Sequence, residues 1–237
     1  MSDGGPGADV PIEVFGDRES LALAAANILA VALGRGLASR GRASLAAAGG
    51  TTPAPVYRRL AAARLDWGEV AVVPTDERWV DPSSADSNEG MFRQTLLTSR
   101  AASARLVSLW SDAPSPDVAA RAVEPRVRAL LPFDAALLGM GEDGHVASLF
   151  PASPILEDGL DPDGERLCLA APPGEPAPPQ ARISLTLAAL LRSRLIVVLT
   201  TGTAKRRTLE EALGGAAFPV RSVLAQDRCP VRVLWSP

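Results

Sequence analysis

Short apolar runs alternate with longer segments of helical period along most of this 237-residue chain. The runs lack a polar residue at every second position, so they predict strands that are buried on both faces. Buried strands separated by helices are typical of a mostly parallel sheet with helices on both faces, and we therefore expect an α/β fold. The expected strands are 11–15, 43–50, 69–75, 105–110, 133–140, 166–172, 181–187, 194–200 and 231–235, and the expected helices are 19–37, 53–63, a segment from about 88, 116–130 and 203–213.

The chain has one compositional break, the Pro-rich segment APPGEPAPPQ at 171–180. It is too short to separate independently folded units, so we predict a single α/β domain over 1–237. Residues 1–10 lack the basic and apolar regions of a signal peptide and are predicted to form a flexible tail.

Composition narrows the classes of partner and compartment. The net charge of −3 argues against a general nucleic-acid or anionic-membrane surface, although a local basic pocket is compatible with it. No apolar stretch is expected to reach the roughly 20 residues that span a bilayer. The two cysteines, Cys168 and Cys229, fit neither a metal motif nor a disulfide framework and are expected to be buried thiols in a reducing cytosol. We expect a cytoplasmic protein with no metal and no cofactor.

Ligands of parallel α/β sheets bind outside the carboxyl ends of the strands, so the segments that follow each strand are the candidate site. The first is Gly49-Gly50-Thr51-Thr52-Pro53. Thr52 suits the N-cap of a helix and Pro53 its first position. Backbone N–H groups and the helix dipole would favour an anion such as phosphate here. The alternative is a helix that is merely well capped.

The second segment, Thr75-Asp76-Glu77-Arg78, places three charges directly after an apolar run. Asp76 could act as an acid or base or bind a sugar hydroxyl, and Arg78 could grip a phosphate with two hydrogen bonds. A local ion pair between Asp76 and Arg78 explains the pattern equally well. Ser87-Asn88, further along, is interpreted as a helix cap.

The third segment carries Lys205, Arg206 and Arg207 in the first turns of a predicted helix, where the helix dipole disfavours cations. A bound anion would offset that cost, whereas long basic side chains extending into water would need no ligand. Arg182 is a further candidate anion contact, with a surface charge on a strand as its alternative.

The fourth segment, Gly139-Met-Gly-Glu-Asp-Gly144, matches the dinucleotide-binding pattern G-x-G-x-x-G. It comes late in the chain, carries two carboxylates where a pyrophosphate would approach, and precedes a helix that Pro151 and Pro154 would cut short. We therefore reject dinucleotide binding. His145, the only histidine, follows directly and could take a proton from water near neutral pH. A structural histidine is the alternative.

Together these segments resemble the 6-phosphogluconolactonase family. GGTTP (49–53), TDERWVDPSSADSN (75–88), GMGEDGHVASLFP (139–151), RISLTL (182–187) and the Gly202–Lys205 pair occur in the family's order over nearly the whole chain. The departures are Thr51 where Ser is frequent, Val146 where Thr is frequent, and a proline displaced to Pro82. The resemblance implies a Rossmann-like α/β fold shared with sugar-phosphate isomerases and deaminases.

The resemblance also implies a reaction, the hydrolysis of 6-phosphoglucono-δ-lactone to 6-phosphogluconate in the oxidative pentose phosphate pathway. In this hypothesis the phosphate lies on Gly49, Gly50, Thr51 and Thr52 with Arg78, Lys205 and Arg182, and His145 is the general base. Either Asp76 or Asp143 could orient the imidazole or bind sugar hydroxyls. No nucleophilic serine and no metal is required.

Two other functions compete. Glucosamine-6-phosphate deaminases have a similar loop but continue into Phe-Asn-Glu-Pro, whereas this chain has Ser148-Leu149-Phe150-Pro151 without a carboxylate. A non-catalytic sugar-phosphate sensor would be expected to carry a further binding domain, and no helix-turn-helix extension or basic patch is present in this sequence. The expected partner is a small sugar-phosphate lactone, and a monomer or small homo-oligomer fits equally.

Overall fold

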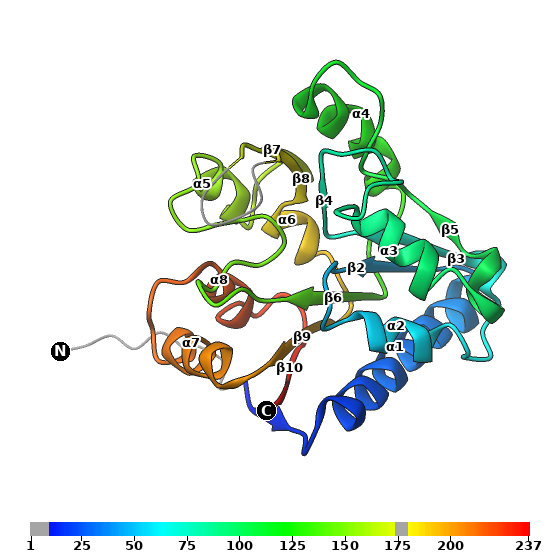
Figure 1. Cartoon of the computed structure of the whole chain (residues 1–237), viewed down its shortest axis with the longest axis horizontal. Helices are drawn as coiled ribbons and strands as arrows, with labels where there is room; N and C mark the ends of the chain where they lie inside the picture. Colours follow the sequence, from blue (N-terminus) through cyan, green and yellow to red (C-terminus); the bar gives the residue numbers. More distant parts are fainter. Residues whose placement is uncertain (1–9, 174–179) are drawn as a thin grey trace.

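A computed structural model of the chain describes residues 10–173 and 180–237 (Figure 1). The predicted tail lies outside these residues except for Val10, which is buried against the core rather than free. Most of the Pro-rich segment, 174–179, also lies outside them.

The centre of the fold is a seven-stranded sheet in which every neighbouring pair is parallel, in the order β1-β10-β9-β6-β2-β3-β5. This confirms the expected mostly parallel α/β sheet. The strands are β1 (Ile12–Val14), β2 (Ala43–Ala47), β3 (Val70–Pro74), β5 (Arg105–Leu106), β6 (Ala135–Gly139), β9 (Ile196–Thr201) and β10 (Val231–Ser236).

A second, antiparallel sheet has three strands in the order β4-β8-β7. They are β4 (Asp76–Arg78), β7 (Cys168–Ala171) and β8 (Arg182–Leu185). Strands were predicted near β7 and β8, whereas the residues of β4 were assigned only to a charged segment that follows a strand. The charged sequence Asp-Glu-Arg has no apolar pattern, and pairing with β8 makes it a strand.

Helices cover both faces of the large sheet because alternate strand residues point to opposite sides. On β2, Leu45 and Ala47 face one core cluster and Ala46 the other. In Figure 1 the helices that pack on the first cluster are coloured from blue to green, and those that pack on the second are coloured from green to red. The first set is α1 (Arg18–Arg40), α2 (Ala54–Leu60) and α3 (Asn88–Thr95). The second set includes α4 (Pro116–Arg128), α6 (Leu187–Leu190), α7 (Thr203–Leu213) and α8 (Pro219–Leu224). A short helix, α5 (Leu156–Leu160), packs its last residue against the second cluster.

Helix α2 begins one residue later than expected. Pro53, not Thr52, occupies the N-cap position, and no side chain caps the helix. The Thr52 hydroxyl is therefore not used as a cap, contrary to the sequence-based interpretation.

Helix α1 corrects the expectation about apolar length. Within the described residues it is the one helix long and apolar enough to cross a membrane by length and composition. Its buried residues, among them Leu21, Leu29 and Leu33, pack into the core on the sheet, which is the usual place of an apolar helix in an α/β protein.

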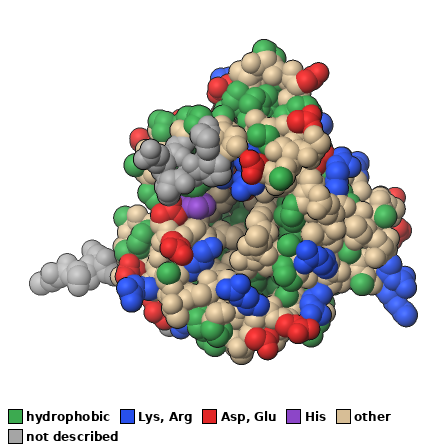
Figure 2. Space-filling view, in the orientation of Figure 1, with side chains coloured by type: hydrophobic (Ala, Val, Ile, Leu, Met, Phe, Trp, Pro, Cys, Tyr) green, Lys and Arg blue, Asp and Glu red, His purple; other side chains and the backbone are tan. Residues whose placement is uncertain are grey.

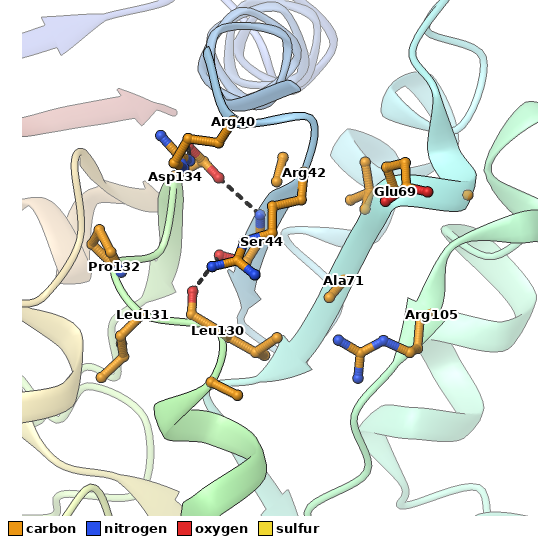
Figure 3. A pocket seen from close by; sticks show the side chains of 14 residues that line it. Arg40, Arg42, Ser44, Glu69, Ala71, Arg105, Leu130, Leu131, Pro132 and Asp134 are labelled. Carbon is orange, nitrogen blue, oxygen red and sulfur yellow. Dashed lines mark hydrogen bonds and ion pairs between the residues drawn. The ribbon is translucent and has the colours of Figure 1, made fainter. Parts of the chain in front are cut away.

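A hollow at the amino ends of the strands is organised by an ion pair (Figure 3). The buried carboxylate of Asp134 contacts the Arg40 guanidinium and accepts the Ser44 N–H at 2.9 Å. The Ser44 hydroxyl donates to the Leu130 carbonyl at 2.8 Å. These contacts fix the end of α1 to the sheet, and none of the predicted site residues lines this hollow.

Candidate active site

A cavity of about 260 Å³ opens at the carboxyl ends of the parallel strands. Figure 2 shows the histidine side chain, in purple, beside a hollow on the face displayed. The cavity is lined by the segments after β2, β3, β6 and β9 and by β8, so it brings together residues from five parts of the chain. Its lining includes Gly49, Gly50, Thr51, Thr52, Asp76, Arg78, His145, Arg182 and Lys205, which is every predicted site residue except Asp143.

Asp143 lies next to the cavity and holds the histidine. Its Oδ1 is 2.6 Å from Nδ1 of His145 and also accepts the His145 backbone N–H at 3.3 Å. Partial burial raises the pKa of Asp143, but the hydrogen bonds and charge of His145 outweigh it, so that pKa lies below its ordinary value. A carboxylate at Nδ1 favours the tautomer that carries its proton there, which leaves Nε2 as the proton acceptor.

Two neighbours restrict the imidazole ring further. The ring packs against Phe150, with ring centroids 4.3 Å apart. On another side it lies so close to Gly141 that a Cβ there would overlap the imidazole. The absence of a side chain at Gly141 thus makes room for the histidine.

Asp76 has other partners. Its Oδ2 accepts the Ser148 hydroxyl at 2.6 Å and lies 3.6 Å from the Arg182 guanidinium, and Oδ1 is 3.3 Å from the Thr75 hydroxyl. Asp76 is only 7% exposed. Of the two carboxylates that could orient His145, the structure places Asp143 against the ring and Asp76 against Arg182.

Arg78 and Arg182 lie directly opposite each other in the antiparallel pair β4–β8. Like charges in this arrangement are destabilising. Asp76 offsets part of the repulsion, but the Nε atoms of both arginines are buried and have no hydrogen-bond partner among the described residues. Burial lowers the pKa of Arg182, while Asp76 acts in the opposite direction. Two guanidiniums held together beside the cavity form a candidate site for an anion.

Lys205 brings a third cation to the cavity from the first turn of α7. Burial lowers the pKa of Lys205, and the nearby carboxylates Glu142 and Asp143 raise it. Its neighbour Arg206 is used elsewhere: it pairs with Glu210 at 2.5 Å and lies over the Trp235 ring. Of the three basic residues predicted in this segment, only Lys205 lines the cavity.

Sequence reasoning missed two buried polar side chains of the site. Asn88 was interpreted as part of a cap, but Ser87 accepts the Gly90 N–H and caps α3, which frees the Asn88 amide to line the cavity. Ser148 was given no role from the sequence, and the structure shows it as the partner of Asp76 across 72 positions of sequence. A polar residue directly after a serine cap was the one signal available for Asn88.

The polar lining suits an anion better than a metal. Among residues 10–173 and 180–237 no group of three His, Cys, Asp or Glu side chains is placed to hold a metal ion. The groups that converge are two guanidiniums, an ammonium, hydroxyls and a glycine-rich loop, which are typical phosphate ligands.

Comparison with known proteins identifies the family of the chain. Residues 16–235 match the model of the family described as glucosamine-6-phosphate isomerases/6-phosphogluconolactonase. The chain belongs to this family. It is 49% identical over 231 residues to the 6-phosphogluconolactonase of Caulobacter vibrioides, covering 98% of this chain and 99% of that protein.

Solved structures of the family share the fold. The crystal structure of a 6-phosphogluconolactonase from Shewanella baltica superposes with a TM-score of 0.92 at 34% identity, over 98% of this chain and 100% of that one. A monomeric glucosamine-6-phosphate deaminase superposes with a TM-score of 0.80 at 20% identity, over 95% of this chain and 96% of that one, which shows a shared fold only. The resemblance inferred from the sequence motifs is thereby confirmed.

Proposed function

We propose that this protein is a 6-phosphogluconolactonase, which hydrolyses 6-phosphoglucono-δ-lactone to 6-phosphogluconate. The observation that carries the proposal is the pairing of Arg78 with Arg182 in a cavity that also holds the carboxylate-bound His145. The cations suit the phosphate of such a substrate, and the histidine suits the attack of water on its ester. The names of the curated relatives support the same reaction.

In the proposed complex the phosphate contacts the Gly49–Thr52 loop, Arg78, Arg182 and Lys205. The lactone ring then extends toward His145. Asp76 is held by Ser148 beside Arg182, and it serves mainly to fix that guanidinium.

His145 is the proposed general base. Nε2 takes a proton from water, and the water oxygen bonds to C1 of the lactone while the carbonyl electrons move to its oxygen. Backbone N–H groups of the glycine-rich turns stabilise the resulting oxyanion. The oxyanion then collapses, the bond between C1 and the ring oxygen breaks, and the imidazolium returns its proton to that oxygen. Asp143 stabilises the imidazolium throughout.

The direct test is hydrolysis of freshly prepared 6-phosphoglucono-δ-lactone by the parent and by His145→Ala, measured against the uncatalysed background. The expected result is strong catalysis by the parent and a loss of at least about 100-fold in the variant with its fold intact. Activity that survives the substitution would support the lactonase function but would show that His145 is not its general base. An inactive parent would contradict the proposal, and glucosamine-6-phosphate would then be the next substrate to assay.

The proposal also covers the pathway, the cellular compartment and the oligomeric state. We place the reaction in the oxidative pentose phosphate pathway, because the substrate and product are the lactone and acid of a phosphorylated hexose. We place the enzyme in the cytoplasm. The proposed reaction takes place within one cavity of one chain, so a monomer suffices for it.

A further inference from the structure

The proposed chemistry leaves one buried carboxylate without a role. Glu77 is the middle residue of β4, and because side chains alternate along a strand it points away from the cavity that Asp76 and Arg78 line. Glu77 is only 1% exposed. Burial raises the pKa of Glu77 to about 7, against the effect of hydrogen bonds from Asn88, Glu89 and Arg78. A buried carboxylate costs free energy, so an apolar residue would pack here more favourably unless the carboxylate has a task.

The carboxylate of Glu77 holds the start of α3. Oε1 accepts the N–H of Asn88 at 2.7 Å, and Oε2 accepts the N–H of Glu89 at 2.6 Å and the Ser87 hydroxyl at 3.2 Å. Oε1 also accepts the N–H of Arg78 at 2.8 Å. The first N–H groups of a helix have no partner within the helix, so Glu77 both satisfies them and ties α3 to β4.

This tie decides where the Asn88 amide lies. Asn88 is the first residue of α3 and is 3% exposed. Its Nδ2 donates to the Asp76 carbonyl at 2.7 Å, and its amide fills the space beside Gly49, where a Cβ would overlap it. Asn88 therefore lies between the strand that carries Asp76 and the loop that begins at Gly49.

We propose that Glu77 is a positioning residue of the active site, which sets the Gly49–Thr52 loop by holding Asn88 between that loop and Asp76. The inference rests on the proposed function, because that function assigns the loop to the substrate's phosphate. The role of Glu77 requires two acceptor oxygens. Four donors converge on the two oxygens, whereas a glutamine would offer one oxygen and turn its NH₂ group toward donors.

The test compares Glu77→Gln, Asn88→Ala, the double variant and the matched control Glu89→Gln. Glu89 is equally buried in the same turn, but its carboxylate pairs with Arg93 at 2.6 Å and does not line the cavity. The measurements are KM and kcat for 6-phosphoglucono-δ-lactone, the Kd of 6-phosphogluconate by calorimetry, and the Tm of each variant.

Glu77→Gln and Asn88→Ala are each expected to raise KM and Kd about tenfold, the equivalent of one net hydrogen bond, with a smaller change in kcat. The double variant is expected to be no worse than the more affected single variant, because both act through one contact. Glu89→Gln is expected to keep the parent's KM and Kd.

A lower Tm for Glu77→Gln with unchanged KM and Kd would overturn the proposal, since Glu77 would then serve the fold alone. Effects that multiply in the double variant would overturn it as well. If Glu77→Gln does not fold, Asn88→Ala still decides: parent values of KM and Kd in that variant would refute the positioning role. A parent that binds 6-phosphogluconate without hydrolysing the lactone would end the proposed function, while a weaker Kd in Glu77→Gln would uphold the positioning role.

Discussion

The contact between Asp143 and His145 allows a quantitative prediction for Asp143→Asn. In the proposed mechanism the imidazole becomes positively charged in the transition state, and the 2.6 Å contact with the carboxylate stabilises that charge. Hydrogen bonds to charged groups contribute about 1.5–3 kcal/mol. The side chains of His145 and Asp143 are 28% and 32% exposed, so solvent screening favours the lower half of that range. A loss of about 1.5–2 kcal/mol corresponds to a fall in kcat of roughly 10–30-fold.

The amide introduced at this position could also donate to Nδ1. That would place the ring proton on Nε2 and disable the base, so the predicted loss is a minimum. KM should change little, because Asp143 does not line the cavity.

Asp76→Asn provides the matched comparison. Asp76 contacts Ser148 and Arg182, so its substitution is expected to raise KM more than it lowers kcat. Both variants would be assayed for lactone hydrolysis above the uncatalysed rate, with Tm as the check on folding. A kcat within about twofold of the parent for Asp143→Asn, together with a large loss of kcat for Asp76→Asn, would show that the wrong carboxylate has been assigned to His145.

Three further predictions concern single side chains. Lys205 is the only lysine in the chain, so an amine-directed reagent should modify one side chain besides the amino terminus. Bound 6-phosphogluconate should protect Lys205 from the reagent, and Lys205→Met should raise KM at least about tenfold. Asp134→Ala should lower the free energy of unfolding by about 3 kcal/mol in urea titration by leaving Arg40 and the Ser44 N–H without their buried partner, with KM unchanged. The raised pKa of Glu77 means that the native state binds the proton of this group more tightly than the unfolded state, so the stability that the group contributes is complete below pH 4.5 and is lost as pH rises through about 7. Relative to Glu77→Gln, the parent's free energy of unfolding should therefore fall by about 3 kcal/mol across that window. A difference between the two proteins that does not change with pH would contradict the raised pKa.

The sequence predicts the large sheet well because its strands are apolar on both faces. Runs such as 133–140 and 194–200 have few structural alternatives, and the strands β6 and β9 lie within or next to them. Strand β4 could not be predicted in this way. Its three residues are charged, and it is a strand only because β8, about a hundred residues later, pairs with it.

The candidate site, like the fold, could be predicted from the sequence only in part. Residues at the ends of predicted strands, such as His145 and Lys205, were located from the strand pattern together with the family resemblance. The choice between Asp76 and Asp143 depends on tertiary contacts, and so does the role of Ser148, whose partner lies 72 positions away. Glu77 gave no signal, since a buried acid that faces away from a site resembles any surface charge in sequence.

The register of β4 against β8 links the protein's stability to its affinity. Main-chain pairing holds Arg78 and Arg182 opposite each other. The two guanidiniums therefore repel each other, and in the proposed function the phosphate would offset this repulsion without first having to gather its ligands. Arg78→Gln would relieve the repulsion and leave the buried Arg182–Asp76 ion pair intact, so a selection for heat resistance would favour it at the expense of substrate binding. Screens that select this protein for stability alone should therefore accumulate inactive variants on these two strands.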